Sequence, residues 1–153
     1  MYTIKNLTSQ NGHVAVETRG IFTIVEHDVD YSVSPSNAQM EYFMSQMNVK
    51  RRQAVANLDG SVGLVLQAGA MQWIAGDVQA TTGVKGVGDL FGKMVKGAVT
   101  KESAIKPEYV GRGTLVTEPT YKYLLTENAA DWAGGLVMED GMFLACESTV
   151  RHE

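Results

Sequence analysis

The sequence is poor in cysteine and histidine and has no long apolar run. Cys146 is the single cysteine among 153 residues, so neither an intrachain disulfide nor a cysteine-based zinc site can form, and nothing points to an oxidising compartment. The apolar stretches are far shorter than the about 20 residues that a bilayer span needs. The N-terminus has neither the basic flank nor the apolar core of a signal peptide. We therefore expect a cytoplasmic protein.

The chain also has no large excess of positive or of negative charge. The chain has 13 Lys and Arg against 17 Asp and Glu, a formal net charge of −4. Nucleic acid as the main partner would require a concentrated basic field, which this balance does not supply. With 44% hydrophobic and 20% charged residues, the composition is that of an ordinary globular protein, and we expect residues 1–153 to form a single β domain.

Proline is scarce and glycine is abundant, with three prolines against 16 glycines. Apolar residues occur in short runs separated by Gly, Asn and Asp, which is typical of an all-β sandwich or barrel. Asp140-Gly141 between two apolar runs predicts a tight hairpin, because glycine tolerates the positive φ of such turns. The expected strands are residues 2–7, 13–18, 21–26, 49–56, 62–67, 70–75, 113–117, 121–126, 136–138 and 142–147.

Residues 36–48 break this pattern and predict a helix. Ser36 and Gln39 have the spacing of a capping box. Four apolar side chains then recur at i, i+3, i+4 and i+7, on one helical face. This stripe packs either on the domain's own sheet or on a partner, since methionine is over-used at adaptable binding surfaces. The candidate interaction surface consists of Met40, Phe43, Met44 and Met47.

Residues 87–100 predict a second, shorter amphipathic helix in a glycine-rich connection. Leu90, Phe91 and Met94 lie on one side, and Lys93 and Lys96 near the other. We expect a lid over an open end of the β core. The alternative is attachment to an anionic membrane surface, which Gly92 and Gly97 make less favourable because each weakens the helix by ~1 kcal/mol.

Metal chemistry has one candidate. Glu26, His27 and Asp28 are close in sequence, but on a strand His27 points away from the two carboxylates. The sequence has no pair of histidines at i, i+2 of the kind that metal-binding β-barrels use. A solvated acidic edge is the favoured interpretation, and a metal-dependent enzyme is the outside alternative.

Other reaction types find little support. Gly86 to Met94 resembles a phosphate-binding loop, but Gly86 is one residue too far from Gly92-Lys93, and Met94 offers no hydroxyl to magnesium. Cys146 lies in an apolar run beside Glu147, which raises rather than lowers a thiol pKa. We therefore expect no catalytic residue and no cofactor.

A basic run, Lys50-Arg51-Arg52, is the remaining signal for a polyanion. On a strand these side chains alternate between faces, and no aromatic platform is interleaved with them. We expect a solvated or self-pairing basic edge rather than a nucleic-acid site.

Three stretches together resemble one family. Gln67 to Trp73, followed by Val78 to Thr82, is similar to the strand pair of the family named for altered inheritance of mitochondria, member twenty-four, a mitochondrial biogenesis family. Lys101-Glu102-Ser103 with Tyr109 to Gly113, and Gly141 to Ala145, resemble two further segments of that family. The resemblance covers residues 60–150, although Lys101 replaces the glycine that is usual there.

The resemblance implies a short double-stranded β-helix like that of the tryptophan RNA-binding attenuation protein, a likeness of fold and not of function. It also implies a further C-terminal block of strands, so we expect either a fragment or a naturally short member. An incomplete β-helix leaves open edges that invite pairing. We expect a non-catalytic, self-associating scaffold or interaction module, a homo-oligomer with Met40, Phe43, Met44 and Met47 at its interface. The helix at residues 87–100 offers a peripheral membrane module as the alternative, and the small-molecule ligand is unknown.

Overall fold

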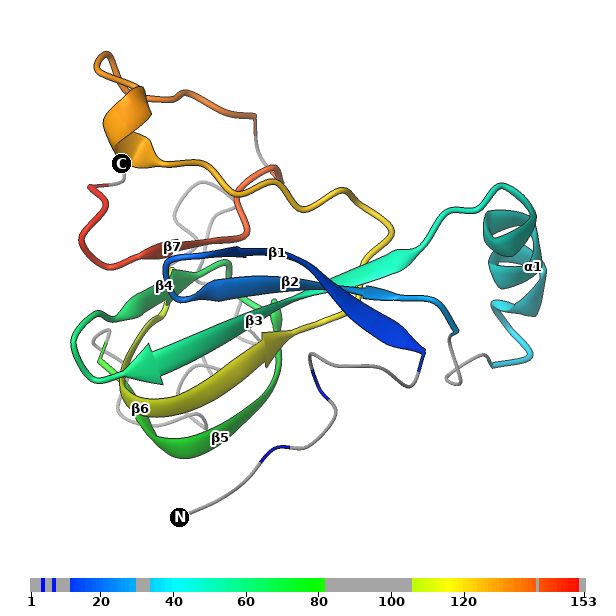
Figure 1. The fold of residues 1–153 in the computed structure, drawn as a ribbon, viewed down its shortest axis with the longest axis horizontal. Coiled ribbons are helices and arrows are strands. Elements are labelled where there is room, and N and C mark those ends of the chain that lie inside the picture. The colour runs from blue at the N-terminus through cyan, green and yellow to red at the C-terminus, as the bar shows by residue number, and fades with distance from the viewer. Residues whose placement is uncertain are drawn as a thin grey trace, which may run out of the picture.

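The computed structural model describes residues 4, 7, 12–29, 34–81, 106–139 and 141–151. Strand accounts for 43% of these residues and helix for 11%, which confirms the expected β-rich fold with a short helix (Figure 1). The elements in chain order are β1 (His13–Arg19), β2 (Phe22–His27), α1 (Ala38–Gln46), β3 (Arg51–Asp59), β4 (Leu64–Leu66), β5 (Met71–Ala80), β6 (Glu108–Thr117), the 3-10 helix η1 (Ala129–Asp131) and β7 (Ala145–Glu147).

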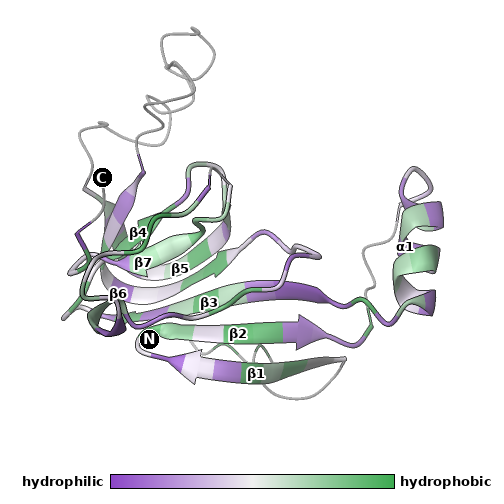
Figure 2. Ribbon diagram, turned by 90° about the horizontal axis from the view of Figure 1, so that it is seen from above, coloured by the Kyte–Doolittle hydropathy of each residue, from purple (hydrophilic) through white to green (hydrophobic). Residues whose placement is uncertain are grey.

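Strand β6 is the centre of one antiparallel sheet. Strand β5 pairs along one side of it, while β3 and β4 follow one another along the other side. Strands β2 and β1 extend the sheet beyond β3, and β7 extends it beyond β4. The sheet curls into a half-barrel, with β4 and β7 folded over one end (Figure 2).

The core lies on both faces of this sheet. Leu64, Leu66 and Leu115 are at most 1% exposed and form the centre of the cluster inside the curl. On the other face, Val55 and Val116 belong to a smaller cluster against which Trp73 packs. Burial on both faces explains why β4 consists of a continuous apolar run rather than an alternating one.

Close backbone approach fixes the position of β5 against β6. A Cβ atom added to Gly111 would lie 2.2 Å from the carbonyl oxygen of Asp77, and one added to Gly113 would lie 2.3 Å from that of Ala75. Both contacts are far inside van der Waals distance, so these positions require glycine. Gly111 and Gly113 therefore have a structural role in the pairing of β5 with β6.

Two of the expected strands are wrong, and a third is confirmed in a shorter form. Residues 121–126 and 136–138 are irregular, and the last strand begins at Ala145 rather than at Met142. Thr120 forms a single bridge with Arg52. After it the chain leaves the sheet, and residues 121–126 do not pair with any strand that the structure describes. At the expected hairpin, the Met142 N–H still donates to the Glu139 carbonyl at 3.1 Å, but the flanking residues do not form a ladder.

The helix at residues 36–48 is confirmed in a shorter form. Its N-cap is Asn37, whose side chain accepts no capping hydrogen bond from the helix backbone, so the expected capping box of Ser36 and Gln39 does not form. The Asn37 Oδ1 atom accepts instead from Ser34 N–H at 2.9 Å. The helix ends before Asn48, whose φ of 55° is the left-handed conformation that closes many helices.

Some expectations fall outside the described residues. They are the helix at 87–100, the segment 86–94 and all but residues 4 and 7 of the first expected strand. Within the described ranges, none of the helices is long and apolar enough to span a bilayer.

Candidate interaction surface

The four side chains of the predicted surface lie on α1, which stands beyond the end of the sheet (Figures 1 and 2). Met40, Phe43 and Met47 are 46%, 53% and 63% exposed, and Met44 is half-buried. No residue of α1 is buried, so packing of this stripe on the domain's own sheet is wrong for the part of the chain described. Met40, Phe43 and Met47 face away from the core.

Polar contacts tether α1 to the domain instead. The Glu41 carboxylate pairs with Arg51 of β3 and accepts a hydrogen bond from the Tyr121 hydroxyl. The Arg51 guanidinium also lies 5.1 Å from the centre of the Tyr121 ring. Burial raises the pKa of the Tyr121 phenol, and the hydrogen bond to Glu41 raises it further. A helix held in this way keeps its apolar side chains available for another surface.

The basic run is paired within the chain. Lys50 contacts Asp28 at 3.2 Å, Arg51 pairs with Glu41, and Arg52 contacts Glu26 at 2.5 Å. The expected self-pairing is therefore confirmed, although β3 lies between β2 and β6 and is not an edge of the sheet. Each cation already has a carboxylate partner.

The candidate metal ligands do not converge. His27 Nε2 contacts Gln53 Oε1 at 2.7 Å on one face of the sheet, while Glu26 and Asp28 are held by the Arg52 and Lys50 side chains. Over the described ranges, no three His, Cys, Asp or Glu side chains come close enough to hold a metal ion. The interpretation of these acids as a solvated edge is wrong for Glu26, because β2 is flanked by β1 and β3, whereas Asp28 follows the end of β2 and is exposed.

Cys146 is half-buried in β7, opposite Val65 of β4. Burial raises the pKa of its thiol, and the neighbouring Glu147 carboxylate acts in the same direction, against an opposing effect of Lys106. The apolar run that contains Cys146 is not buried along its whole length, since Met142 is 69% exposed. A thiol with a raised pKa is a poor nucleophile.

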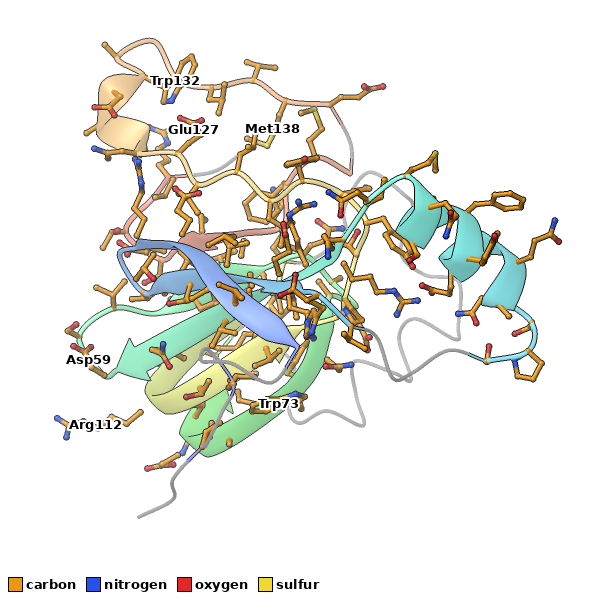
Figure 3. The ribbon with its side chains drawn as sticks, turned by 45° about the vertical axis from the view of Figure 1, so that its right-hand side comes forward. Asp59, Trp73, Arg112, Glu127, Trp132 and Met138 are labelled. Carbon is orange, nitrogen blue, oxygen red and sulfur yellow. The ribbon has the colours of Figure 1, made fainter. Side chains whose placement is uncertain are left out.

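A second apolar surface was not predicted. We call the described residues between β6 and β7, 118–139 and 141–144, the arm. It runs across the sheet and carries the 3-10 helix η1 at its far end (Figures 1 and 3). Its exposed apolar side chains are Tyr123, Leu125, Trp132, Leu136, Val137, Met138 and Met142. Pro119 and Gly134-Gly135 were the sequence signals against regular strands here.

Comparison with known proteins gives one match. A family described as mitochondrial biogenesis AIM24 matches residues 45–153, which include the end of α1, strands β3 to β7 and the whole arm. None of the curated proteins or solved structures compared with the chain matches it.

Proposed function

We propose that this chain, which belongs to the mitochondrial biogenesis AIM24 family, is a non-catalytic, self-associating β module that acts as a scaffold or interaction protein. Bulky apolar side chains displayed on a well-tethered element support association rather than catalysis. The single cysteine suits a cytoplasmic setting for such a module.

The observation that carries the proposal is the exposed stripe of α1. Phe43 and Met47 are each more than half exposed, and fully burying such a side chain stabilises a complex by about 1.5–3 kcal/mol. Single exposed apolar residues are normal on proteins, but a contiguous set is typical of an interface.

The geometry favours a second copy that packs α1 against α1. A two-fold interface is self-complementary and brings the same stripe from both chains together. The Glu41 carboxylate would remain outside it, because Arg51 and Tyr121 hold that side of the helix toward the sheet. The dimer would then bury apolar side chains without burying an unpaired charge.

Light scattering at micromolar concentration tests this proposal. Wild-type protein should be a dimer, and Met47→Glu or Phe43→Glu should dissociate it, because each places a charge in the buried stripe. Gln46→Glu is the matched control, since residue 46 is an exposed polar position of the same helix. Lys50→Glu is unsuitable as a control because Lys50 pairs with Asp28.

Two results would count against the proposal. One is a monomeric wild-type protein at these concentrations. The other is a dimer that Met47→Glu leaves intact, which would place the interface elsewhere. Met44→Glu is less informative, because Met44 is half-buried and the charge would also disturb the attachment of α1.

A further inference from the structure

The arm has a fixed path over the sheet. At its start, Arg52 and Thr120 exchange two backbone hydrogen bonds of 2.8 and 2.9 Å, and at its end the Gln67 N–H donates to the Leu144 carbonyl at 2.8 Å. Lys122 Nζ donates to the Gly141 carbonyl at 3.1 Å, which joins the outgoing and returning parts. A long connection held in one conformation is typical of binding loops.

Several apolar side chains of the arm are not covered by any of the residues that the structure describes. Val137 is 97% exposed, Leu125 77% and Met142 69%. These residues lie far apart in sequence, but the contact between Lys122 and Gly141 brings the two halves of the arm together. These apolar side chains are therefore exposed on a connection that is hydrogen-bonded to the sheet at both ends and joined between its two halves.

The same surface is acidic. Glu118, Glu127, Asp131 and Glu139 are all exposed, and within the described residues none of them forms an ion pair. The single cation within this segment is Lys122, whose ammonium contacts the Gly141 carbonyl, and Lys106 from outside the segment lies 4.4 Å from the centre of the Phe143 ring. Trp132 Nε1 donates to Glu127 Oε2 at 3.4 Å, so an acidic group and a large aromatic side chain lie side by side (Figure 3).

We propose that the arm is a docking surface for a cationic amphipathic segment of another protein. Such a segment offers apolar side chains to exposed residues such as Leu125 and Val137, and Lys or Arg side chains to the exposed carboxylates of the same arm. The proposal concerns a different surface and a different partner from the self-association through α1, and neither depends on the other.

A second copy of the chain fits the arm poorly. A two-fold contact between arms would set the carboxylates of one copy against those of the other, and like charges brought together oppose association. Contact between the arm and α1 would not supply cations either, because Lys50, Arg51 and Arg52 are already paired with carboxylates.

Binding of designed peptides tests the proposal with the full chain. The probe is a fluorescein-labelled helix of leucine and lysine with leucines on one face. Its two controls are the same helix with glutamate in place of lysine and a scrambled leucine-lysine peptide with no apolar face. We expect saturable binding of one lysine peptide per chain, weakened by salt, with a change in tryptophan emission that Trp132→Phe abolishes.

Variants then locate the site. Neutralising the arm with Glu127→Gln, Asp131→Asn and Glu139→Gln together should weaken binding about tenfold, since each exposed ion pair contributes modestly. Val137→Ser should also weaken it. Asp77→Asn removes an exposed carboxylate from β5 and should leave binding unchanged.

Three results would overturn the proposal. Equal binding of the glutamate or the scrambled peptide would show non-specific attraction, and unchanged binding by the neutralised arm would place the site elsewhere. Dissociation of an oligomer by the arm variants would show that a second copy occupies the arm. Loss of self-association in the α1 variants alone leaves these measurements untouched, so the two proposals fail separately.

Discussion

The guanidinium carbon of Arg52 lies 4.0 Å from the centre of the Tyr123 ring, which joins the third strand to the arm. On its other side the same guanidinium contacts Glu26 at 2.5 Å, and Arg52 as a whole is 7% exposed. A desolvated cation over an aromatic face contributes about 2 kcal/mol. Arg52 therefore serves the packing of the arm on the sheet and is not available to an external polyanion.

Arg52→Met should destabilise the fold by about 3 kcal/mol, because it leaves the Glu26 carboxylate without its partner and removes the contact under Tyr123. Arg112→Met is the matched control, since Arg112 is exposed and such substitutions change stability by about 0.5 kcal/mol or less. Urea unfolding of both variants gives the comparison. Equal costs would contradict the role assigned to Arg52.

Glu41→Gln should loosen α1 without unfolding the sheet. The substitution removes the ion pair with Arg51 and weakens the bond from Tyr121, while α1 contributes no buried residue to the core. We expect amide hydrogen exchange to rise about tenfold within Ala38–Gln46 and to stay unchanged in β3 and β6, as local opening requires. Gln39→Glu, at an exposed position of the same helix, is the control. Unchanged exchange in α1 would show that other contacts hold it.

The sheet was predictable where apolar runs are both short and buried. Leu64-Val65-Leu66 reads as a fully buried strand, and it is one. For β5, the sequence pattern predicts an end at Ala75, since Gly76-Asp77 favours a turn, but the strand extends to Ala80. In the folded chain Gly76 lies opposite Gly113, and Asp77 lies opposite Arg112, so the strand continues. The length of β5 is determined by its pairing with β6, and the local sequence pattern does not contain information about that pairing.

The candidate site was predictable in part for the same reason. Helical spacing predicts that Met40, Phe43 and Met47 lie on one face. Whether that face is covered depends on the orientation of the helix, which the contacts of Glu41 with Arg51 and Tyr121 determine. Tyr121 is remote from Glu41 in sequence, so the local pattern does not contain this information. The arm was missed because Leu125 and Val137 lie in runs typical of strands. Their exposure follows from the absence of a pairing strand in the described residues, not from their composition.

Gly111→Ala should cost about 3 kcal/mol or more, because its φ of 127° is unfavourable for other residues and the added Cβ would overlap the Asp77 carbonyl. Gly134→Ala is the control, since nothing lies within 4 Å of a Cβ at that position. Thermal unfolding should lower the Tm of the first variant and leave the second unchanged. A Gly111→Ala protein as stable as wild type would show that β5 is not held by this approach.

Cys146 should react slowly with disulfide reagents in the folded protein. Burial and Glu147 raise the pKa of its thiol, and each unit of increase lowers the thiolate fraction tenfold. Labelling at neutral pH should therefore be slower than that of a free cysteine and reach that rate in denaturant. Fast labelling of the native protein would contradict the half-buried position and reopen a catalytic role.

The same raised pKa makes stability depend on pH. The folded state favours the neutral thiol, and this preference contributes to the free energy of unfolding. The contribution is complete below the unfolded thiol pKa of about 8.5. It is lost as the pH rises through the higher pKa of the folded protein. The difference in unfolding free energy between wild type and Cys146→Ala should therefore be constant from pH 6 to 8 and shift against the wild type above that range. Urea unfolding of both proteins across this range measures the difference, and tyrosine ionisation cancels because both chains contain the same tyrosines. A difference independent of pH up to pH 10 would show that the thiol is not perturbed by its surroundings in β7.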